Sequence, residues 1–426
     1  MRGAWTGRLL VSAAACGMAM AASVLASGQK PEPMPGVLHE NPAIRYISQP
    51  TTDRVATLIE SLAQSGRSLQ RDPKTGYLRP VLAALGVPEE SQLLVFSKTG
   101  VQSAYTNPQN PRALYFNESV AVGYIAGAPL LELAAHDPQQ GVNFYVVDQS
   151  AATPVFRRAT MCLSCHVSSS TLDVPGFLSR SSTVGDDGSV MPQLSATSDV
   201  DHTTPHPERW GGYYVTSEMV SGYTTLAHLG NITFSPRGST SNQVFVDWMN
   251  SAPETRGYLS AASDNVALLV FDHQMRAANL LTRVNWEARV AANGGRAIAT
   301  DSTVRGLVDQ LADYLLFVGE APLPFPLTPR AGFAARFQST IPKDRKGRSF
   351  GQLNVETRLL QYPCSYMIYS DAFDGLTPDV KTAVYGRMLE ILSGRDTRAA
   401  YARLKTDDRL AILEILRDTK PDFPAH

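Results

Sequence analysis

This sequence is poor in cysteine, and neither sign of charge dominates it. The chain has four cysteines in 426 residues, and its 38 lysines and arginines nearly balance its 39 aspartates and glutamates. So few cysteines do not form a disulfide framework in a protein of this size. A net charge of −1 gives no general attraction to nucleic acid or to an acidic membrane surface. With 43% hydrophobic residues and neither low-complexity tracts nor internal repeats, the chain reads as globular.

A long apolar run occurs at the N-terminus. Residues 1–26 read "MRGAWTGRLLVSAAACGMAMAASVLA", in which Arg2 and Arg8 precede an uncharged stretch that ends in small residues. This pattern predicts a signal peptide cleaved after Ala26, and hence a periplasmic or otherwise exported bacterial protein. Two alternatives stay open: the run, about 18 residues long, is retained as a membrane anchor, or Cys16 accepts a lipid.

Three regions follow, and together they predict an α+β fold. Residues 27–150 begin with a helical pattern and continue as a β-rich region. Residues 151–260 are rich in Ser, Thr, Gly and Pro and contain the chain's clearest chemical motif. Long loops of this kind need something to pack against, and a large apolar cofactor would supply it. Residues 261–426 repeat apolar residues at helical spacing and predict a mainly helical region that packs on the second one.

Individual elements can be predicted within these regions. An amphipathic helix is expected over residues 53 to 66, and β-type runs separated by turn residues lie between 93 and 148. Further along, Ser302 is expected to cap a helix and Gly394 to end one.

The motif lies in "MCLSCHVSSS", where Cys162 and Cys165 are three positions apart and His166 follows at once. Two thiols at this spacing can each add to a vinyl group of haem, and the adjacent histidine then lies under the iron as its proximal ligand. The motif occurs once, so we predict one covalently bound haem c, held by Cys162 and Cys165, with His166 as an iron ligand. Export favours this reading, because such attachment takes place outside the cytoplasm.

Other readings of the cysteine pair are weaker. A thioredoxin-like dithiol is expected near a βαβ pattern, a structural zinc site needs further ligands, and a disulfide across three positions adds little stability. The remaining cysteine, Cys364, lies among aromatic residues and reads as a buried small apolar side chain. Arginines near the motif are candidate partners for the haem propionates, or else simply solvated; they are Arg157, Arg158 and Arg180.

Several stretches resemble the succession of motifs in large exported bacterial proteins with a single c-type haem, which are labelled cytochrome c domain-containing proteins. The stretches are "PRALYFNESVAVGY", "CLSCH", "LDVPGFLSRSS", "HTTPHPERWGGYYVT", "HLGN", "VALLVFDHQMRAANLLTRVNWEA" and "QYPCSYMIYSDAFDGL". The resemblance covers most of the chain after the signal. The resemblance implies haem binding and electron transfer, without a reaction that the group shares.

The ligand on the other side of the iron is left open by the sequence. His202, His228 and His273 fall within the resembling stretches, whereas Met219 does not. We take His228 as the first candidate distal ligand, because "AHLGN" is typical of a loop, and His273 as the second. Without iron, His273 would read as a buried core histidine.

Three functions remain under consideration. The first is electron transfer with periplasmic redox partner proteins, which involves no nucleic acid and involves a membrane only if the N-terminal segment is retained. The second is a haem enzyme of the peroxidase or oxidase kind with an open or weakly ligated distal site, in which a distal histidine works with Arg209 or Trp210. The third is a haem-based sensor or binding module.

Overall fold

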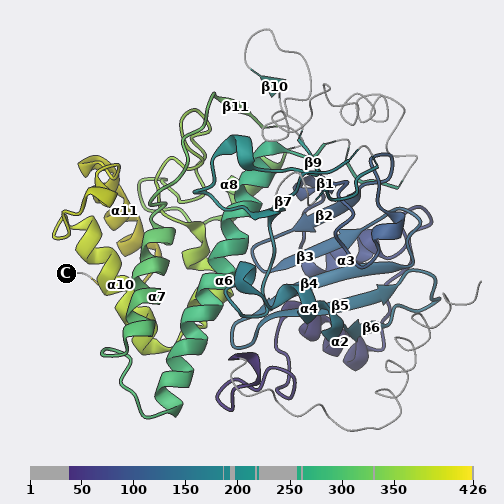
Figure 1. Ribbon diagram of the computed structural model, residues 1–426, viewed down its shortest axis with the longest axis horizontal. Helices are drawn as coiled ribbons and strands as arrows, with labels where there is room; N and C mark the ends of the chain where they lie inside the picture. The colour runs from purple at the N-terminus through teal and green to yellow at the C-terminus, as the bar shows by residue number, and fades with distance from the viewer. Residues whose placement is uncertain are drawn as a thin grey trace, which may run out of the picture.

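An antiparallel sheet lies beside a group of helices formed by the C-terminal part of the chain (Figure 1). The computed structural model describes residues 38–185, 187–191, 197–215, 218–219, 257–260, 262–329 and 332–424. The predicted signal peptide, Cys16 and His228 lie outside these residues. The mixed helix-and-sheet class is confirmed, and the c-type haem core stays a prediction.

Seven strands form the main sheet in the order β6-β5-β4-β3-β2-β1-β9, and each neighbouring pair is antiparallel. Their bounds are β1 (Leu93–Val95), β2 (Arg112–Phe116), β3 (Val120–Tyr124), β4 (Leu130–Asp137), β5 (Gly141–Asp148), β6 (Phe156–Arg158) and β9 (Tyr213–Tyr214). The β-type runs predicted between residues 93 and 148 all contain strands, and β4 is an additional one. Two short pairs lie outside this sheet: β7 (Arg180–Ser181) with β8 (Ser198–Asp199), and β10 (Glu218–Met219) with β11 (Leu327–Thr328).

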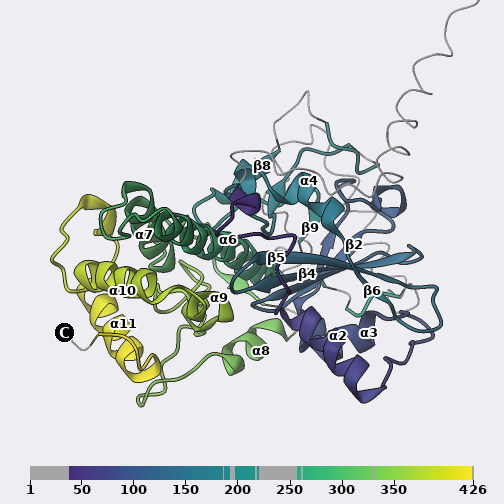
Figure 2. The same ribbon diagram turned by 90° about the horizontal axis from the view of Figure 1, so that it is seen from below.

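One face of the sheet is covered by α2 (Arg54–Ser65) and α3 (Leu78–Leu85), as Figure 2 shows. Side chains at alternate positions of β4 point to these helices, and Leu131, Leu133 and Ala135 are all buried. The period of two along the strand explains this alternation. The helices therefore seal this face, and a site can form on the opposite one.

Helix α2 begins and ends as its sequence predicts. The Asp53 carboxylate accepts hydrogen bonds from the backbone amides of Val55 and Ala56, at 2.9 and 3.0 Å. Gly66 follows the last helical residue with φ 64°, a left-handed conformation that glycine adopts without a steric penalty. The amphipathic helix predicted over residues 53 to 66 is confirmed.

The C-terminal part is mainly helical, as expected. Its helices are α6 (Asn265–Asn293), α7 (Ser302–Leu315), α8 (Phe333–Thr340), α9 (Asp371–Asp374), α10 (Pro378–Leu392) and α11 (Thr406–Thr419). The prediction that Ser302 caps α7 is wrong by one residue, because the Asp301 carboxylate accepts from the first amides and Ser302 is already helical. Gly394, predicted to end a helix, follows α10 with φ 76°.

Helix α6 is the central element, because it lies between the sheet and the layer of α7 and α10 (Figures 1 and 2). It is 29 residues long and buries polar as well as apolar side chains; Asp272, His273 and Asn279 are at most 2% exposed. Buried polar groups cost free energy unless they find partners, so each of them must be bonded to another part of the fold. Those partners define the candidate site.

Candidate functional site

The two motif cysteines lie on one helical turn, on the sheet face opposite α2 and α3 (Figure 2). A short 3₁₀ helix (Thr160–Cys162) runs directly into α4 (Leu163–His166), so Cys162 and Cys165 are neighbours along one side of the turn. Both are free thiols; Cys165 is exposed and Cys162 half-buried. Burial, with smaller contributions from Glu132 and Cys165, raises the pKa of Cys162 to about 11.

A backbone carbonyl orients the imidazole of His166. Its Nδ1 lies 2.8 Å from the carbonyl oxygen of Gly176, and the ring centroid lies 4.6 Å from that of Phe144. A carbonyl only accepts hydrogen bonds, so Nδ1 carries the hydrogen and Nε2 keeps its lone pair. Burial lowers the pKa of His166 to about 4, the Gly176 bond opposes this, and the positive charges of Arg112 and Arg180 add to it. His166 is therefore neutral near pH 7, the form in which histidine ligates a metal.

The loop that supplies this carbonyl is fixed to α6. The side-chain amide of Asn279 accepts from the backbone amide of Phe177 at 2.9 Å and donates to its carbonyl at 2.8 Å. Gly176 packs so closely that an added Cβ would overlap the Asn279 side chain. On the other side, the backbone amide of Val142 donates to the carbonyl of Pro175 at 2.9 Å and ties the loop to the sheet.

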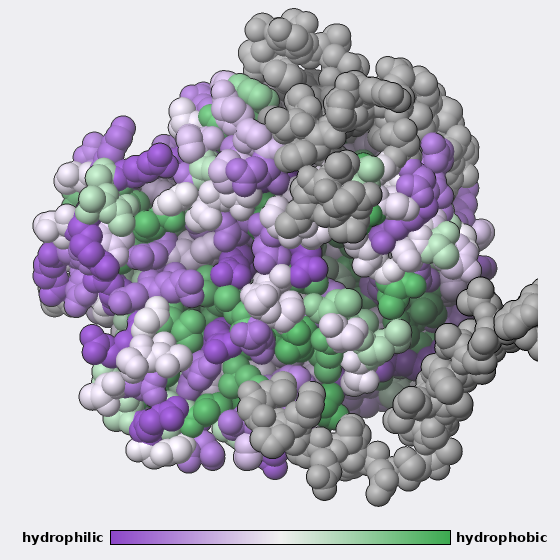
Figure 3. Space-filling model, viewed as in Figure 1, coloured by the Kyte–Doolittle hydropathy of each residue, from purple (hydrophilic) through white to green (hydrophobic). Residues whose placement is uncertain are grey.

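The sheet face that carries α4 includes described residues that remain partly exposed. Two cross-strand rows form its centre: Leu114, Gly123, Glu132 and Val146 in one, and Ala121, Ala134 and Phe144 in the next. The four aliphatic side chains among them are partly exposed, although they belong to inner strands of the sheet. Figure 3 shows apolar side chains gathered at the surface on the face that carries α4, whereas the α10–α11 end is mostly hydrophilic.

These features fit a haem. A flat apolar group lying on the two rows would remove their exposed apolar surface from water, at about 25 cal/mol per Å². Glycine and alanine at the centre of the rows leave room for such a group. His166 packs against Phe144, which belongs to the second row, so the motif histidine lies beside this part of the sheet. Arg112, on β2, lies 4.0 Å from the Glu132 carboxylate through one guanidinium nitrogen, and its buried Nε has no hydrogen-bond partner among the described residues. It is therefore a candidate partner for a negatively charged propionate.

The three arginines suggested by the sequence differ in their surroundings. Arg158 donates to the Tyr46 carbonyl at 3.1 Å and to Asn143 Oδ1 at 2.7 Å, and its register opposite Tyr145 puts it on the α2 side of the sheet. Arg157 is exposed. Arg180 pairs with Asp199 and donates to Ser170, and its charge acts on His166. Arg180 and Arg112 therefore act on the pKa of the motif histidine, whereas Arg158 is held by protein partners on the other side of the sheet.

His273, the second candidate distal ligand, is fully buried and has protein partners at both ring nitrogens. Its Nδ1 lies 2.7 Å from Nδ1 of His202, and its Nε2 lies 2.6 Å from Oγ of Ser365. The ring stacks on Phe317 and on Tyr314, with centroids 4.2 and 5.0 Å apart. Burial lowers the pKa of His273 well below its usual value, and His202 adds to this. Ligation by His273 would require it to give up one of these hydrogen bonds.

The other distal candidates are not brought to the motif by a described contact. His228, the first candidate, lies outside the described residues, and Met219 is described only as backbone in β10. His202 is buried between His273 and the rings of Tyr314 and Phe317. The distal ligand is therefore still a prediction.

A buried carboxylate next to His273 forms a second polar cluster. Asp272 accepts from Ser179 Oγ at 2.6 Å and from Trp210 Nε1 at 2.7 Å, and its Oδ2 lies 3.9 Å from a guanidinium nitrogen of Arg209. Arg209 also donates to the carbonyl of His202 at 2.9 Å. Burial raises the pKa of Asp272 to about 6, although Arg209 and both hydrogen bonds oppose the shift.

The motif and this polar cluster are connected through the segment that follows the motif. At one end Phe177 is held by Asn279, and two residues later Ser179 is held by Asp272, both from α6. The sequence pointed to Arg209, Trp210 and His273 but not to these partners. An aspartate and a histidine inside an otherwise apolar helical run were the signal available for the cluster, whereas nothing local marked Gly176 or Asn279.

The described residues contain neither a metal-binding cluster nor a membrane-spanning helix. No group of three or more His, Cys, Asp or Glu side chains there is arranged to hold a metal ion. Of the helices described, none is both long and apolar enough to cross a membrane.

Cys364 is fully buried, and burial raises the pKa of its thiol well above the usual value, which agrees with its expected packing role.

Known proteins add no further constraint. No protein-family model matches the chain, and no curated protein or solved structure is significantly similar to it. The resemblance to exported mono-haem proteins, and the function that follows from it, is accordingly an inference from the residues themselves.

Proposed function

We propose that this chain is a c-type cytochrome with one covalently attached haem, and that it transfers electrons between protein partners outside the bacterial cytoplasm. One observation carries the proposal. His166, directly after two free thiols on one turn, is half-buried, neutral and oriented by the Gly176 carbonyl, so its Nε2 remains available as a ligand. Iron-ligating histidines are commonly held through their other ring nitrogen in this way.

Each part of the site then has a role. Cys162 and Cys165 would hold the porphyrin through thioether bonds, and His166 would ligate the iron through Nε2. The partly exposed rows of the sheet would shield an apolar side of the porphyrin from water. Arg112 and Arg180 would balance the negative charge of the propionates. When bound, the haem supplies a one-electron Fe(III)/Fe(II) couple. The loop held by Asn279 keeps His166 in one orientation, which limits the rearrangement that accompanies electron transfer.

The buried polar cluster favours a second candidate, a haem enzyme of the peroxidase or oxidase kind. A plain electron carrier has no need of the pair formed by His202 and His273, or of a tryptophan bonded to the buried carboxylate of Asp272. Such groups can hold a proton or stabilise charge next to a reaction centre. None of the described contacts joins them directly to His166, so electron transfer is the first proposal.

Attachment is tested first. The full chain is exported to the periplasm of a bacterial host with haem-attachment machinery, and its mass is measured after denaturation. We expect the mass of one added haem in the wild type and in C364A, and none when Cys162 and Cys165 are both replaced by alanine. A wild-type protein without covalent haem would overturn the proposal.

Absorption spectra then separate the two functions. A low-spin ferric spectrum, with a ferrous form that does not bind carbon monoxide, supports the electron carrier. A high-spin ferric spectrum together with carbon monoxide binding overturns the carrier in favour of an enzyme with an open site. In either case H166A should lose the wild-type spectrum, whereas H136Q, at a buried histidine with a protein partner of its own, should retain it.

A further inference from the structure

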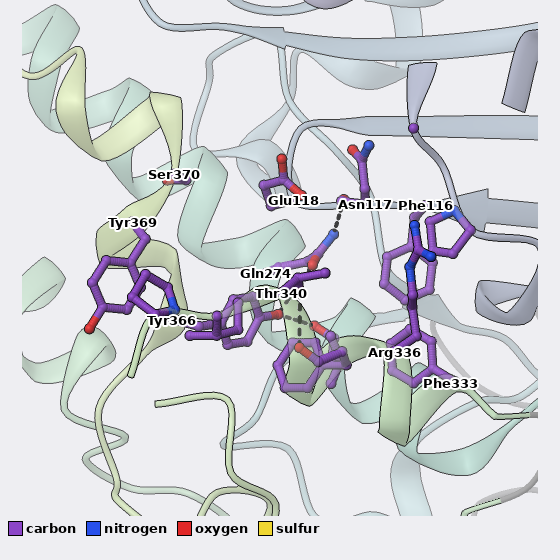
Figure 4. A pocket seen from close by; sticks show the side chains of 16 residues that line it. Phe116, Asn117, Glu118, Gln274, Phe333, Arg336, Thr340, Tyr366, Tyr369 and Ser370 are labelled. Carbon is purple, nitrogen blue, oxygen red and sulfur yellow. Dashed lines mark hydrogen bonds between the residues drawn. The ribbon is translucent and has the colours of Figure 1, made fainter. Parts of the chain in front are cut away.

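A cavity of about 390 Å³ lies between the sheet, α6, α8 and the short 3₁₀ helix Tyr366–Tyr369 (Figure 4). None of the motif residues lines it. Its wall is rich in rings: Phe116, Phe333, Phe337, Tyr366 and Tyr369 all take part. A cavity of about 150 Å³ is large enough for benzene, so this one has room for a molecule of two fused or linked rings.

Polar groups in the wall are mostly bonded to protein already. Gln274 donates to the Asn117 carbonyl at 2.7 Å and accepts from the Tyr366 hydroxyl at 3.1 Å. Glu118 pairs with Arg54, with nitrogen and oxygen 2.7 Å apart. A ligand therefore meets a wall that behaves as apolar in its interior, because a new hydrogen bond would have to displace an existing one.

The hydroxyl groups of Thr340 and Tyr369 are also already hydrogen-bonded to protein. The Thr340 hydroxyl donates to the carbonyl of Phe337 at 2.9 Å, and the Tyr369 hydroxyl lies 2.6 Å from Oγ1 of Thr419. Thr340 is an exposed residue at the last position of α8, so the cavity opens on that side.

Arg336 is the exception. It is exposed on α8 and lines the cavity, and its guanidinium has no hydrogen bond or ion pair with any described residue. Figure 4 shows Arg336 beside Phe333 and Phe116, at the opposite end of the cavity from Tyr369. Arg336 and Thr340, the exposed lining residues of α8, mark the mouth of the cavity. The unpaired charge available to a ligand there is positive, because Glu118, the acidic residue of the lining, already pairs with Arg54.

We propose that this cavity binds an aromatic monocarboxylate, with its rings among the aromatic side chains and its carboxylate on Arg336. Rings pack well against Phe and Tyr at offset or edge-to-face angles, and a guanidinium binds a carboxylate through two parallel hydrogen bonds. A neutral molecule of the same shape would leave Arg336 unused, and a dianion would place a second charge against the apolar wall. The site is independent of haem attachment and extends the chain's function beyond electron transfer.

The test is a calorimetric titration of the full chain with 2-naphthoate, and with its neutral analogue 2-naphthamide. We expect one site for naphthoate in the wild type. R336Q should weaken naphthoate binding roughly tenfold or more, the usual size of a charge-assisted hydrogen-bond loss, and change naphthamide binding less than about twofold. R305Q is the matched control: Arg305 is likewise exposed, on α7, and lies away from the cavity lining.

A second variant tests the place of binding without relying on charge. T340W puts a large side chain at the mouth from an exposed position and should abolish binding of both ligands, while circular dichroism and thermal melting confirm the fold. Three outcomes would overturn the proposal: no binding to the wild type, naphthoate binding unchanged in R336Q, or binding that survives in T340W. Because none of these readouts involves haem, they are independent of the proposed electron transfer.

Discussion

His166 and Gly176 are ten residues apart in the chain, and the histidine Nδ1 lies 2.8 Å from the glycine carbonyl oxygen. The carbonyl is held in place by Asn279, which makes two hydrogen bonds to the next residue, Phe177. Helix α6 therefore orients the motif histidine through this loop. Asn279 acts as a positioning residue for His166.

Replacing Asn279 by leucine should loosen this arrangement. The variant N279L keeps a similar volume but leaves the amide and carbonyl of Phe177 unpaired, and we expect a loss of about 2 to 3 kcal/mol in the free energy of unfolding. Because His166 loses its fixed partner, the absorption spectrum or reduction potential of the haem-loaded protein should also change. Urea unfolding and redox titration measure the two effects.

The control for N279L lies on the same helix. Asn285 is also buried and hydrogen-bonds to Pro138, Gly375 and Thr377, away from the motif loop. N285L should lower stability by a similar amount but leave the haem spectrum and potential unchanged. If N279L behaves like N285L in both measurements, Asn279 is structural only and the positioning role is wrong.

The bond between Trp210 and Asp272 should contribute more than that of an ordinary buried indole. W210F removes a 2.7 Å hydrogen bond to a buried carboxylate, whereas W286F removes a 3.0 Å bond to the backbone carbonyl of Gln139. Bonds to charged groups contribute about 1.5 to 3 kcal/mol and neutral ones about 0.5 to 1.5 kcal/mol. We expect W210F to be the less stable variant in urea unfolding. Equal losses would mean that Asp272 is protonated in the folded protein.

Stability should fall in mild acid, in part because of His136. Its Nε2 lies 2.9 Å from Thr282 Oγ1, and burial lowers its pKa from 6.5 to about 4, although Asp137 and Asp371 oppose the shift. As the pH falls, His136 takes up its proton in the unfolded chain before it does so in the folded protein. The unfolding free energy is therefore fully retained with respect to His136 above about pH 6.5 and decreases as the pH falls towards 4.

The variant H136Q isolates this effect, because glutamine can bond Thr282 but does not titrate. Between about pH 7.5 and about pH 5, the wild type should lose about 2 kcal/mol more of its unfolding free energy than H136Q. The other histidines titrate in both proteins, so their contributions cancel in the difference. Parallel pH curves for the two proteins would show that His136 is already accommodated as a cation.

Three glycines with open space around their Cα atoms should differ in how they tolerate alanine. An added Cβ meets nothing within 4 Å at Gly306 in α7, at Gly386 in α10 or at Gly66 after α2. G306A and G386A should each raise the unfolding free energy by about 0.5 to 1 kcal/mol, because alanine favours the helix. Gly66 has φ 64°, so G66A should lower it. Thermal melting of the three variants checks this, and a gain in G66A would contradict the strain argument.

The sequence by itself was sufficient for features that depend on neighbours along the chain. A capping aspartate marks the start of α2 and a glycine marks its end, and the apolar period of α6 predicts a helix. Capping and helical periodicity both act within one or two turns, so neighbouring residues are enough to reveal them. The spacing of Cys162, Cys165 and His166 likewise defines a chemical motif within a single turn.

The tertiary structure decided what depends on residues far apart. Strand β4, with the sequence "LLELAAHD", has good helix formers, yet it is a strand because β3 and β5 pair with it along both edges. The partners of His166 and His273 also come from other elements, so no local pattern identifies them. A hydrogen bond across many residues depends on how the elements pack, and local sequence preferences do not encode that packing.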